Sequence, residues 1–512
     1  MEFSLTLQTL ILLPMLCLFI GAFLTYLIGR ICYNEGVPKL IGVVSLLFML
    51  LSLLSIYWLY TKLSPPISEL PLEYPTPVDS TSIFLNLKVD SLGLLIATVA
   101  ALMGTIVSLY SITYMEKDRG LDRYYSLLLM LVGAIVGLAF VSDVFSLYVF
   151  FELMCISSYA LVAFRKDKWE PIEAGFKYIV MSVTGSILVL FGISIIFSQT
   201  GKLDFASIQI AMTSVSNNGA VNVSIILFIV GFGVKAAIVP LHTWLPDAHA
   251  AAPSGISAML SGIVIEAGFF AMIRVLLMFS TDIGFGLILA IFAVITMTVG
   301  NLLALAQTDI KRMLAYSSVT QMGYIVLGIG LGFEYGARAG FEGGLFHIFT
   351  HAFMKGLAFL CAGAIIYRIS TRNIEEMRGI GRTMPFTAVA FAIAGLALAG
   401  VPPLSGFMSK WIIYKAGVDA AVATNNLTLV VFTAFAVANS VLSLGYYLPA
   451  INTMFSSDIS EKAKNAKEAP ILMLAAIGIM AFITIIIGIY PDLVLKNIEP
   501  AVDFIIKLVG GK

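Results

Sequence analysis

The sequence predicts an all-α protein that crosses a membrane many times, and three observations support this. Hydrophobic residues make up 59% of the 512 residues, whereas only 12% are charged, about half the share expected in a soluble globular protein. The apolar residues form runs of about 20 residues, the length of a helix that spans a bilayer. Short polar segments separate these runs. We therefore expect a polytopic helical membrane protein without a separate soluble domain.

Fourteen runs are long and apolar enough to be spans, and they lie near 5–28, 40–61, 90–114, 124–141, 145–164, 174–198, 223–240, 255–279, 284–306, 313–332, 343–367, 385–418, 428–451 and 471–491. The stretch 63–88 contains five prolines and is expected to form a loop outside the membrane. The first run has no signal-peptide cleavage pattern, so we expect it to remain as a helix.

The basic residues of the short loops predict the orientation. Loops after odd-numbered runs hold seventeen Lys and Arg residues, and loops after even-numbered runs hold four, which are Lys62, Lys88, Lys202 and Arg338. Short loops rich in Lys and Arg stay in the cytoplasm. We therefore expect a multi-pass protein of the cell membrane (inner or plasma membrane) with both termini outside the cytoplasm.

Two runs are interrupted by proline. Pro240 lies in "VKAAIVPLHTW" of the seventh run, and Pro402 and Pro403 lie in "ALAGVPPLSGFMSKW" of the twelfth. Proline removes a backbone donor and frees carbonyl groups, and a broken helix survives at membrane depth only where it faces protein or water. A lysine lies near each interruption, Lys235 before the first and Lys410 after the second. Helices 7 and 12 are therefore predicted to be broken at polar sites.

The spacing of the broken helices predicts an inverted repeat. They are five spans apart, and because five is odd, equivalent helices of two five-helix units run in opposite directions. We expect the units to be helices 4–8 and 9–13. The predicted division is 1–119 for helices 1–3 with the loop 63–88, 120–282 for the first repeat, 283–455 for the second repeat, and 456–512 for helix 14 and the tail.

Ionisable residues inside the runs are candidates for function, because each costs about 3 kcal/mol or more at the bilayer centre and usually faces the bundle interior or a water path. The seven main candidates, which we call the relay candidates, are Glu152, Lys235, Glu266, His347, His351, Lys355 and Lys410. Lys177 and His242 are supporting candidates.

Several of these residues also have a purely structural interpretation. Lys177 is near a helix start and could extend to the membrane surface. Glu266 could pair with Arg274, two turns further on. Glu152 could form a lone structural salt bridge. Lys235 is about twelve residues into its span, so a structural role explains it least well.

His347, His351 and Lys355 are spaced at i, i+4 and i+8 in "FHIFTHAFMKGLAF", which places them in one stripe on a helix. Two histidines at this spacing can share a zinc ion, but the HExxH glutamate is missing and a lysine is a poor neighbour for a cation. A structural stripe is a second alternative. A hydrated proton relay is the interpretation we favour, because histidine titrates near neutral pH. We expect neither a metal nor another cofactor.

Five segments give the chain a specific resemblance to a known family, and they are "FFELMCISSYALV", "GFGVKAAIVPLHTWLPDAHAAAPSGISAML", "TDIKRMLAYSSVTQMGYI", "FHIFTHAFMKGLAFLCAG" and "GVPPLSGFMSKW". They resemble the antiporter-like, proton-translocating subunits of respiratory complex I, Mrp-type sodium/proton antiporters and membrane-bound hydrogenases. The resemblance covers roughly residues 120 to 415.

The resemblance implies a role for each buried ionisable residue. Glu152 matches the family's fifth-helix glutamate, which pairs with the seventh-helix lysine, here Lys235. Lys410 matches a twelfth-helix residue that is lysine or glutamate in the family. His347 and His351 match the central histidines, with Lys355 beside them, and the run with Asp309, Lys311 and "SSVTQMGY" matches a structural motif.

One position departs from the family pattern. Many members carry lysine in "GIVIKAG" of helix 8, where this chain has Glu266. A buried carboxyl could relay protons or help to bind a cation such as Na⁺. The medium length resembles the Mrp D subunit or the hydrogenase subunit lettered H, and the departure at Glu266 favours the hydrogenase or a related archaeal complex.

The resemblance implies an ion-translocating subunit in a larger membrane complex that contains sister antiporter-like subunits, with H⁺ and possibly Na⁺ as the transported ions. The chain has no haem, flavin or iron–sulfur motif, so redox chemistry would belong to a partner. The first alternative is a subunit of a stand-alone Mrp-type Na⁺/H⁺ antiporter. A carrier for an organic solute and a structural scaffold are further alternatives. Acidic and basic residues are equal at 30 each, which gives no reason to expect nucleic acid.

Overall fold

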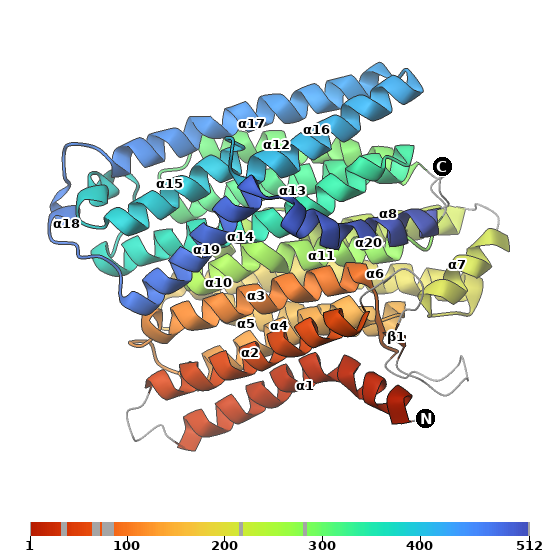
Figure 1. Cartoon of the computed structure of the whole chain (residues 1–512), viewed down its shortest axis with the longest axis horizontal. Coiled ribbons are helices and arrows are strands. Elements are labelled where there is room, and N and C mark those ends of the chain that lie inside the picture. Colours follow the sequence, from red (N-terminus) through yellow and green to blue (C-terminus); the bar gives the residue numbers. More distant parts are fainter. Residues whose placement is uncertain are drawn as a thin grey trace.

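The computed structural model describes residues 2–31, 38–63, 72–73, 86–214, 219–279 and 284–509. The predicted fold class is confirmed, since long apolar helices make up a single bundle with their axes nearly parallel (Figure 1). Two short strands, β1 (Leu72–Glu73) and β2 (Lys88–Val89), pair antiparallel. Most of the predicted loop 63–88 lies outside the described residues.

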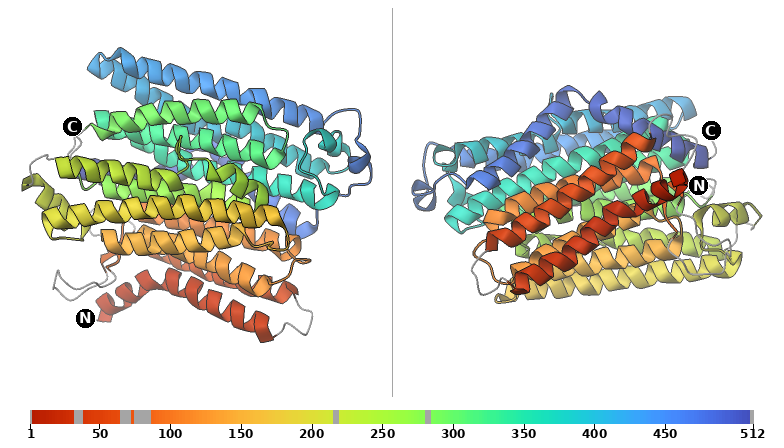
Figure 2. Two further views of the ribbon diagram at one scale, coloured as in Figure 1. Left: turned by 180° about the vertical axis from the view of Figure 1, so that it is seen from behind. Right: turned by 60° about the horizontal axis from the view of Figure 1, so that its bottom comes forward.

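Three helices form the N-terminal part, α1 (Glu2–Ile31), α2 (Pro38–Leu63) and α3 (Ser91–Tyr114). Helices α1 and α2 lie at one edge of the bundle, and α17 (Leu427–Met454) lies at the opposite edge, as two views in Figures 1 and 2 agree. Large apolar side chains on these edge helices are exposed, among them Phe23, Leu54 and Val441. Such faces are suited to lipid rather than water.

The next part of the chain contains the first predicted repeat. Its elements are α4 (Leu121–Phe140), α5 (Val144–Val162), α6 (Trp169–Thr200), α7 (Phe205–Ser214), α8 (Gly219–Lys235), α9 (Trp244–Ala251), α10 (Ser254–Met259), the π-helical segment η2 (Leu260–Val264) and α11 (Ile265–Leu276). The last three form one continuous helical run.

The second predicted repeat follows it. Its elements are α12 (Phe285–Leu305), α13 (Ile310–Tyr335), α14 (Arg338–Ile369), the 3₁₀ turns η4 (Glu375–Met377) and η5 (Ile380–Arg382), α15 (Pro385–Ala399), α16 (Ser405–Thr424) and α17. The chain then continues through α18 (Glu461–Lys464), α19 (Ile471–Ile489) and α20 (Asp492–Val509).

Both predicted helix breaks are present. Helix α8 ends at Lys235, and α9 begins only at Trp244, whose indole nitrogen donates to the carbonyl of Val234 at 2.8 Å. The second break separates α15 from α16 between Ala399 and Ser405. The breaks therefore present backbone carbonyls inside the bundle, where side chains can bind them.

Within the described residues, twelve helices are long and apolar enough to cross a membrane. The predicted fourteen spans would also count α8 and would treat α15 and α16 as one interrupted span. Both this number and the inverted repeat remain predictions.

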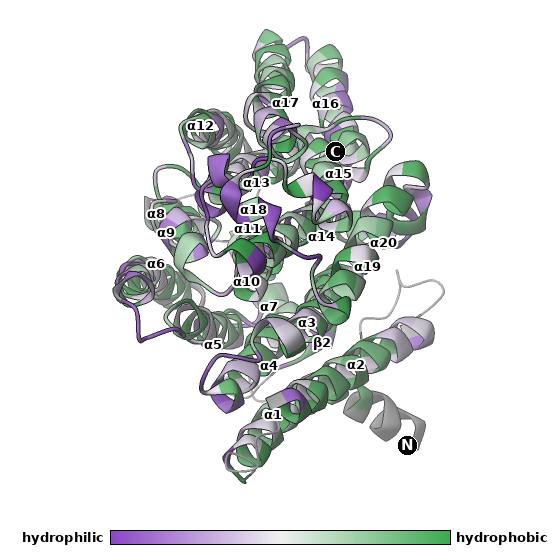
Figure 3. Ribbon diagram, turned by 90° about the vertical axis from the view of Figure 1, so that its left-hand side faces the viewer, coloured by the Kyte–Doolittle hydropathy of each residue, from purple (hydrophilic) through white to green (hydrophobic). Residues whose placement is uncertain are grey.

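The interior of the bundle is formed by the run α10–η2–α11 and by α13 and α14, in which nearly every residue is buried. Figure 3 shows these helices near the middle of the bundle, with apolar surfaces on the outer helices. His347, His351 and Glu266 lie on the interior helices. The fold thus holds these polar residues away from lipid.

Candidate functional site

Lys235 is the last residue of α8 and is 2% exposed. Its ammonium group donates to the hydroxyl of Ser158 on α5 at 3.0 Å and to the hydroxyl of Tyr178 on α6. The ammonium nitrogen lies 4.6 Å from the ring centre of Tyr178, which stacks on Trp244 with ring centres 4.0 Å apart. Hydroxyl oxygens and aromatic faces therefore replace part of the water that a charged amine loses on burial.

Glu152 lies on α5, one and a half turns before Ser158, and is partly buried. Its carboxylate accepts a hydrogen bond from the Ser186 hydroxyl of α6. The expected ion pair between Glu152 and Lys235 is not formed in this structure, because each group is bound to a serine instead. Both residues nevertheless lie between the same three helices.

Lys235 also contacts the central helix of the bundle. Its aliphatic stem packs on Gly268 of α11, where an added Cβ would lie 2.7 Å from Lys235 Cγ. Glu266 is two residues away on the same helix. The first broken helix therefore touches the element that carries the next predicted relay residue.

Glu266 of α11 and His351 of α14 form a direct pair, which we call the central pair. Glu266 Oε1 and His351 Nδ1 are 2.5 Å apart, and both side chains are fully buried. The alternative pairing of Glu266 with Arg274 is wrong, because Arg274 binds Asp90 at 2.5 Å. The departure from the family pattern is therefore a carboxyl–imidazole pair between two interior helices.

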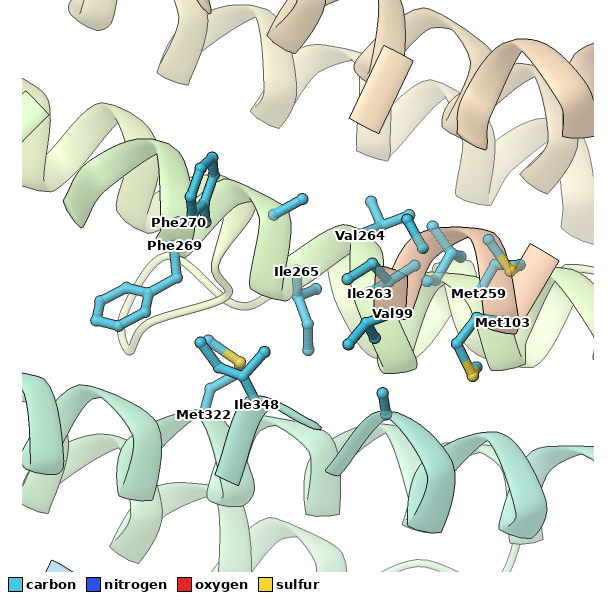
Figure 4. Close-up of a cluster of buried hydrophobic side chains, with 14 of the residues drawn as sticks. Val99, Met103, Met259, Ile263, Val264, Ile265, Phe269, Phe270, Met322 and Ile348 are labelled. Carbon is cyan, nitrogen blue, oxygen red and sulfur yellow. The ribbon is translucent and has the colours of Figure 1, made fainter. Parts of the chain in front are cut away.

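A close approach of the two helices makes the central pair possible. Gly262 in η2 faces the backbone of α14, and an added Cβ would lie 3.0 Å from the carbonyl oxygen of Ala352. Apolar residues surround this contact, and Figure 4 shows Ile265 and Phe269 of α11 facing Met322 and Ile348. An ionisable pair in such surroundings cannot exchange protons with bulk water directly.

His347 lies one turn before His351, and the two rings are stacked with centres 6.0 Å apart. His347 Nδ1 lies 2.8 Å from Ser409 Oγ of α16, and Nε2 lies 3.1 Å from Gln321 Oε1 of α13. The predicted stripe is present for both histidines, and His347 directs it toward the second broken helix.

Lys355 is fully buried one turn further along α14. Its ammonium group donates to the carbonyl of Leu314 on α13 at 2.8 Å and to the hydroxyl of Tyr447 on α17 at 3.4 Å. The structure therefore places it against α13 and α17, with no direct hydrogen bond to either histidine.

Lys410 of α16 is 1% exposed and binds the second break directly. Its ammonium group donates to the carbonyl of Leu398 at 2.8 Å and to Ser440 Oγ at 3.1 Å. It also lies 4.4 Å from the ring centre of Tyr324. The carbonyl released by the end of α15 is thus the main partner of this buried lysine.

The two supporting candidates, Lys177 and His242, lie apart from the seven relay candidates. Lys177 is exposed and pairs with Glu173 at 2.8 Å and with Asp247 at 3.0 Å, which fits the interpretation of a lysine at the membrane surface. His242 is mostly buried, and its ring lies 6.4 Å from that of Tyr316. Neither makes a hydrogen bond to the seven relay candidates in the described part of the chain.

The sequence interpretation missed the partners of the relay candidates, and three of them are instructive. Tyr178 and Gln321 are polar residues within apolar runs, so a signal was present. The third is the carbonyl of Leu398, which leaves no trace in the side-chain sequence except the nearby prolines. No group of three or more His, Cys, Asp or Glu residues gathers as a metal site within the described residues.

Comparisons with known protein families support one assignment. The family model described as "NADH:quinone oxidoreductase/Mrp antiporter, TM" matches residues 141–438. A second model, described as "NADH-Ubiquinone oxidoreductase (complex I), chain 5 N-terminus", matches residues 76–125. Together the two models include every relay candidate.

Two curated relatives resemble the chain over most of its length. Hydrogenase-4 component B of Escherichia coli (strain K12) is 33% identical over 79% of this chain, and the match spans 62% of that relative. F(420)H(2) dehydrogenase subunit N of Methanosarcina mazei is 31% identical over 80% of this chain and 82% of its own length.

Two solved structures have a closely similar fold. A chain of the membrane-bound sulfane sulfur reductase, an archaeal respiratory membrane complex, has a TM-score of 0.86 and 31% identity, with 98% of both chains covered. A chain of the Mrp complex from Dietzia sp. DQ12-45-1b has a TM-score of 0.84 over 97% of this chain and 100% of that chain. The latter is 22% identical, so it supports the fold alone.

Proposed function

Because the chain belongs to the NADH:quinone oxidoreductase/Mrp antiporter transmembrane family, we propose that this antiporter-like subunit translocates protons within a larger membrane complex. The observation that carries the proposal is the line of buried polar groups from the Lys235 break to the Lys410 break. Charged groups at membrane depth are costly and usually mark an ion path.

The proposed path begins on the cytoplasmic side near the break after α8. A proton carried by Lys235 passes to the central pair, Glu266 and His351, then to His347 and finally to Lys410, from which it leaves toward the outside. Each transfer removes one proton from the donor and adds it to the acceptor. Lys355 lies beside this path, bound to α13 and α17, where its charge acts on the histidines.

Glu152 is the proposed gate. A carboxylate close to an ammonium group stabilises the bound proton, and separating the two groups favours its release. The bond between Glu152 and Ser186 corresponds to the separated state. A rotation that moves Glu152 from Ser186 to Lys235 would reload the lysine.

The parent complex is proposed to be a membrane-bound hydrogenase or a related respiratory complex. Among the solved structures, the chain from the respiratory complex is 31% identical, against 22% for the Mrp chain. Curated relatives of both kinds are 31–33% identical, a Na⁺/H⁺ antiporter subunit A1 among them. The redox centre would belong to partner subunits, and sister antiporter-like subunits are expected next to this one. The match spans 62% of hydrogenase-4 component B, so the activity of that longer protein is not proposed for this chain.

A subunit of an Mrp-type Na⁺/H⁺ antiporter is the second candidate. A curated Na⁺/H⁺ antiporter subunit A1 that is 31% identical to this chain supports it, and the Glu266 carboxyl could supply an oxygen ligand to Na⁺ in such a subunit. A carrier for an organic solute has less support. The buried polar groups form a line between the two breaks, which suits an ion path better than a solute site.

We also propose the orientation with both termini outside the cytoplasm. The distribution of Lys and Arg supports it, and α1 begins at the same end of the bundle at which α20 finishes (Figure 1). The proposed units remain 1–119, 120–282, 283–455 and 456–512. The position of each broken helix, fourth among the spans of its unit, supports this division.

The proposed function is tested with the Lys235→Ala variant. The complex that co-purifies with the chain in mild detergent is reconstituted into vesicles, and acidification is followed with a pH-sensitive dye. Loss of a positioned proton-transfer group is expected to lower the rate by about 100-fold or more. The matched control is Lys177→Ala, a surface lysine of the same repeat, which should remain near the wild-type rate.

Wild-type acidification by the assembled Lys235→Ala complex would remove this lysine from the mechanism. The co-purifying subunits separate the two candidate complexes. A hydrogenase-like or other redox subunit supports the first candidate, and sister antiporter subunits without a redox partner support the second.

A further inference from the structure

Gln321 connects the central histidines to the second broken helix. It lies on α13 and is fully buried. Its Nε2 donates to the carbonyl of Leu398 at 3.0 Å, and its Oε1 lies 3.1 Å from His347 Nε2. The same carbonyl accepts from Lys410 at 2.8 Å. One backbone oxygen thus joins Gln321 and the buried lysine.

The Leu398 carbonyl determines which way the Gln321 amide points. A carbonyl oxygen can only accept hydrogen bonds, so the amide atom that faces it is the NH₂ group. A flipped amide would place two oxygens against each other. The amide oxygen therefore faces His347, and its orientation follows from the hydrogen-bond partners rather than from atom positions alone.

This orientation fixes the tautomer of His347. An amide oxygen is an acceptor, so the Nε2 atom in contact with it carries a hydrogen. In the neutral ring Nδ1 is then without hydrogen and accepts from the Ser409 hydroxyl, 2.8 Å away. In the imidazolium form Nδ1–H donates to the same hydroxyl, and the bond to Gln321 is unchanged.

We propose that Gln321 is a positioning residue that holds His347 as the Nε2–H tautomer, so that the ring gains and loses its proton only at Nδ1. That nitrogen faces Ser409, which directly precedes Lys410. A proton that comes from the central pair must therefore also reach His347 at Nδ1, on the side of the second broken helix, where the Ser409 hydroxyl lies. The tautomer is a property of the folded chain, whereas its role in transport rests on the proposed function.

Surrounding groups are consistent with exchange at Nδ1. Thr350 Oγ1 donates to Ser409 Oγ at 3.2 Å, which supplies that hydroxyl with a donor when its own hydrogen points to His347. Ser409 can also turn toward the carbonyls of Ser405 and Gly406, each at 3.3 Å. The serine thus has a partner in both protonation states of the ring.

The test is nitrogen NMR of the full chain in lipid nanodiscs with ¹⁵N-labelled histidine. The four histidines are assigned by difference spectra, using His347→Asn for this ring. Wild-type protein is expected to show bare Nδ1 and protonated Nε2 at His347. In Gln321→Leu, we expect the ratio of the two tautomers to shift by about tenfold or more, because an accepting bond of about 1.4 kcal/mol or more is lost.

Two further variants separate positioning from folding. In Gln321→Glu, the protonated carboxyl can donate to the Leu398 carbonyl through its hydroxyl and accept from Nε2 through its other oxygen, so this variant should keep the wild-type tautomer. Gln307→Leu is the matched control, since its amide also donates to a backbone carbonyl, at 3.0 Å from Leu303 O, but touches no histidine. Both variants should retain the His347 signals of the wild type.

A protonated Nδ1 in wild-type neutral His347, or an unchanged tautomer in Gln321→Leu, overturns the proposal. Acidification by Gln321→Leu is expected to fall about tenfold. A changed tautomer with wild-type acidification would overturn the role in proton exchange. The NMR result does not depend on transport, so failure of the proposed function is recognised separately through Lys235→Ala.

Discussion

The two broken helices hold their buried lysines in different ways. In the first half, Lys235 is bound by the side chains of Ser158 and Tyr178, with Glu152 on the same helix as the serine. In the second half, the main partner of Lys410 is the backbone carbonyl of Leu398. No carboxylate forms an ion pair with either lysine among the described residues.

This difference indicates a division of roles. Hydroxyl groups and a nearby carboxylate can rearrange by side-chain rotation, so the affinity of Lys235 for its proton can change while the helices stay in place. The carbonyl of Leu398 moves only with the end of α15. We therefore infer that the first site responds to local rotamer changes and the second to movement of the broken helix.

The largest expected effect compares the two lysines directly. Lys410→Ala should reduce vesicle acidification by about 100-fold, as Lys235→Ala does, if the two sites act in series. Lys410→Gln, which can still donate to Leu398 and Ser440, should show the same loss with near-normal thermal stability. A residual rate close to half of the wild-type rate in either variant would instead indicate two independent paths.

The central pair is the next largest test, because it joins the two halves. Glu266→Gln can still accept from His351 but cannot titrate, so acidification should fall at least about tenfold with nearly unchanged stability. Glu266→Ala leaves a buried ring nitrogen without its partner and should also lose about 1–3 kcal/mol of unfolding free energy. Denaturation in detergent and dye-based acidification measure the two effects. Equal transport by Glu266→Gln and wild-type protein would exclude the carboxyl from the path.

A smaller effect tests the contrast between side-chain and backbone partners. Tyr178→Phe removes one of two hydroxyl acceptors from Lys235 and should slow acidification about tenfold, since bonds to charged groups contribute about 1.5–3 kcal/mol. Ser440→Ala leaves the Leu398 carbonyl bound to Lys410, so we expect a decrease of about threefold or less. A larger loss for Ser440→Ala than for Tyr178→Phe would contradict the comparison.

The smallest effect concerns a surface contact between the halves. Asp247 of α9 binds Lys177 of α6 at 3.0 Å and Arg312 of α13 at 2.6 Å. Partial burial alone would raise the pKa of the Asp247 carboxyl, but the hydrogen bonds from Lys177 and Arg312 outweigh it, and the pKa is lowered. A lowered pKa stabilises the fold above the pKa of the unfolded chain, near 4. This stabilisation is lost as the pH falls through the folded value.

Asp247→Asn should therefore lower the unfolding free energy by about 1 kcal/mol at neutral pH. Its difference from wild type should shrink as the pH falls below about 4. Thermal unfolding at several pH values measures this. Glu375→Gln, in a surface pair within one short turn, is the control. A difference between Asp247→Asn and wild type that grows toward acid pH would contradict the assignment.

The helical spans and the burial of the candidate residues could be predicted from sequence, because lipid imposes length and apolarity on each run and makes every internal charge conspicuous. The partners could not. The sequence suggests Arg274 as the structural partner of Glu266. The packing of α11 on α14 instead brings His351 to Glu266. The resemblance predicts an ion pair between Glu152 and Lys235, but Glu152 accepts a hydrogen bond from Ser186 instead.

Backbone partners are the least predictable from sequence. Leu398 is an apolar residue by its side chain, yet its carbonyl binds Lys410 and Gln321. The prolines at 402 and 403 indicate that carbonyls are freed, but not which side chains reach them. The resemblance assigns the run "SSVTQMGY", which contains Gln321, a structural role. A fully buried amide among apolar residues nevertheless requires hydrogen-bond partners.

The contact at Gly262 sets a limit on how this sequence can vary. The residue has no ionisable group, but a methyl group there would lie 3.0 Å from the α14 backbone, and the neighbouring helices would have to separate. A carboxyl and an imidazole share a proton only at short range. Separating Glu266 from His351 by a few tenths of an ångström would therefore weaken the hydrogen bond that couples their titration. Position 262 is thus constrained by proton chemistry that takes place one turn away.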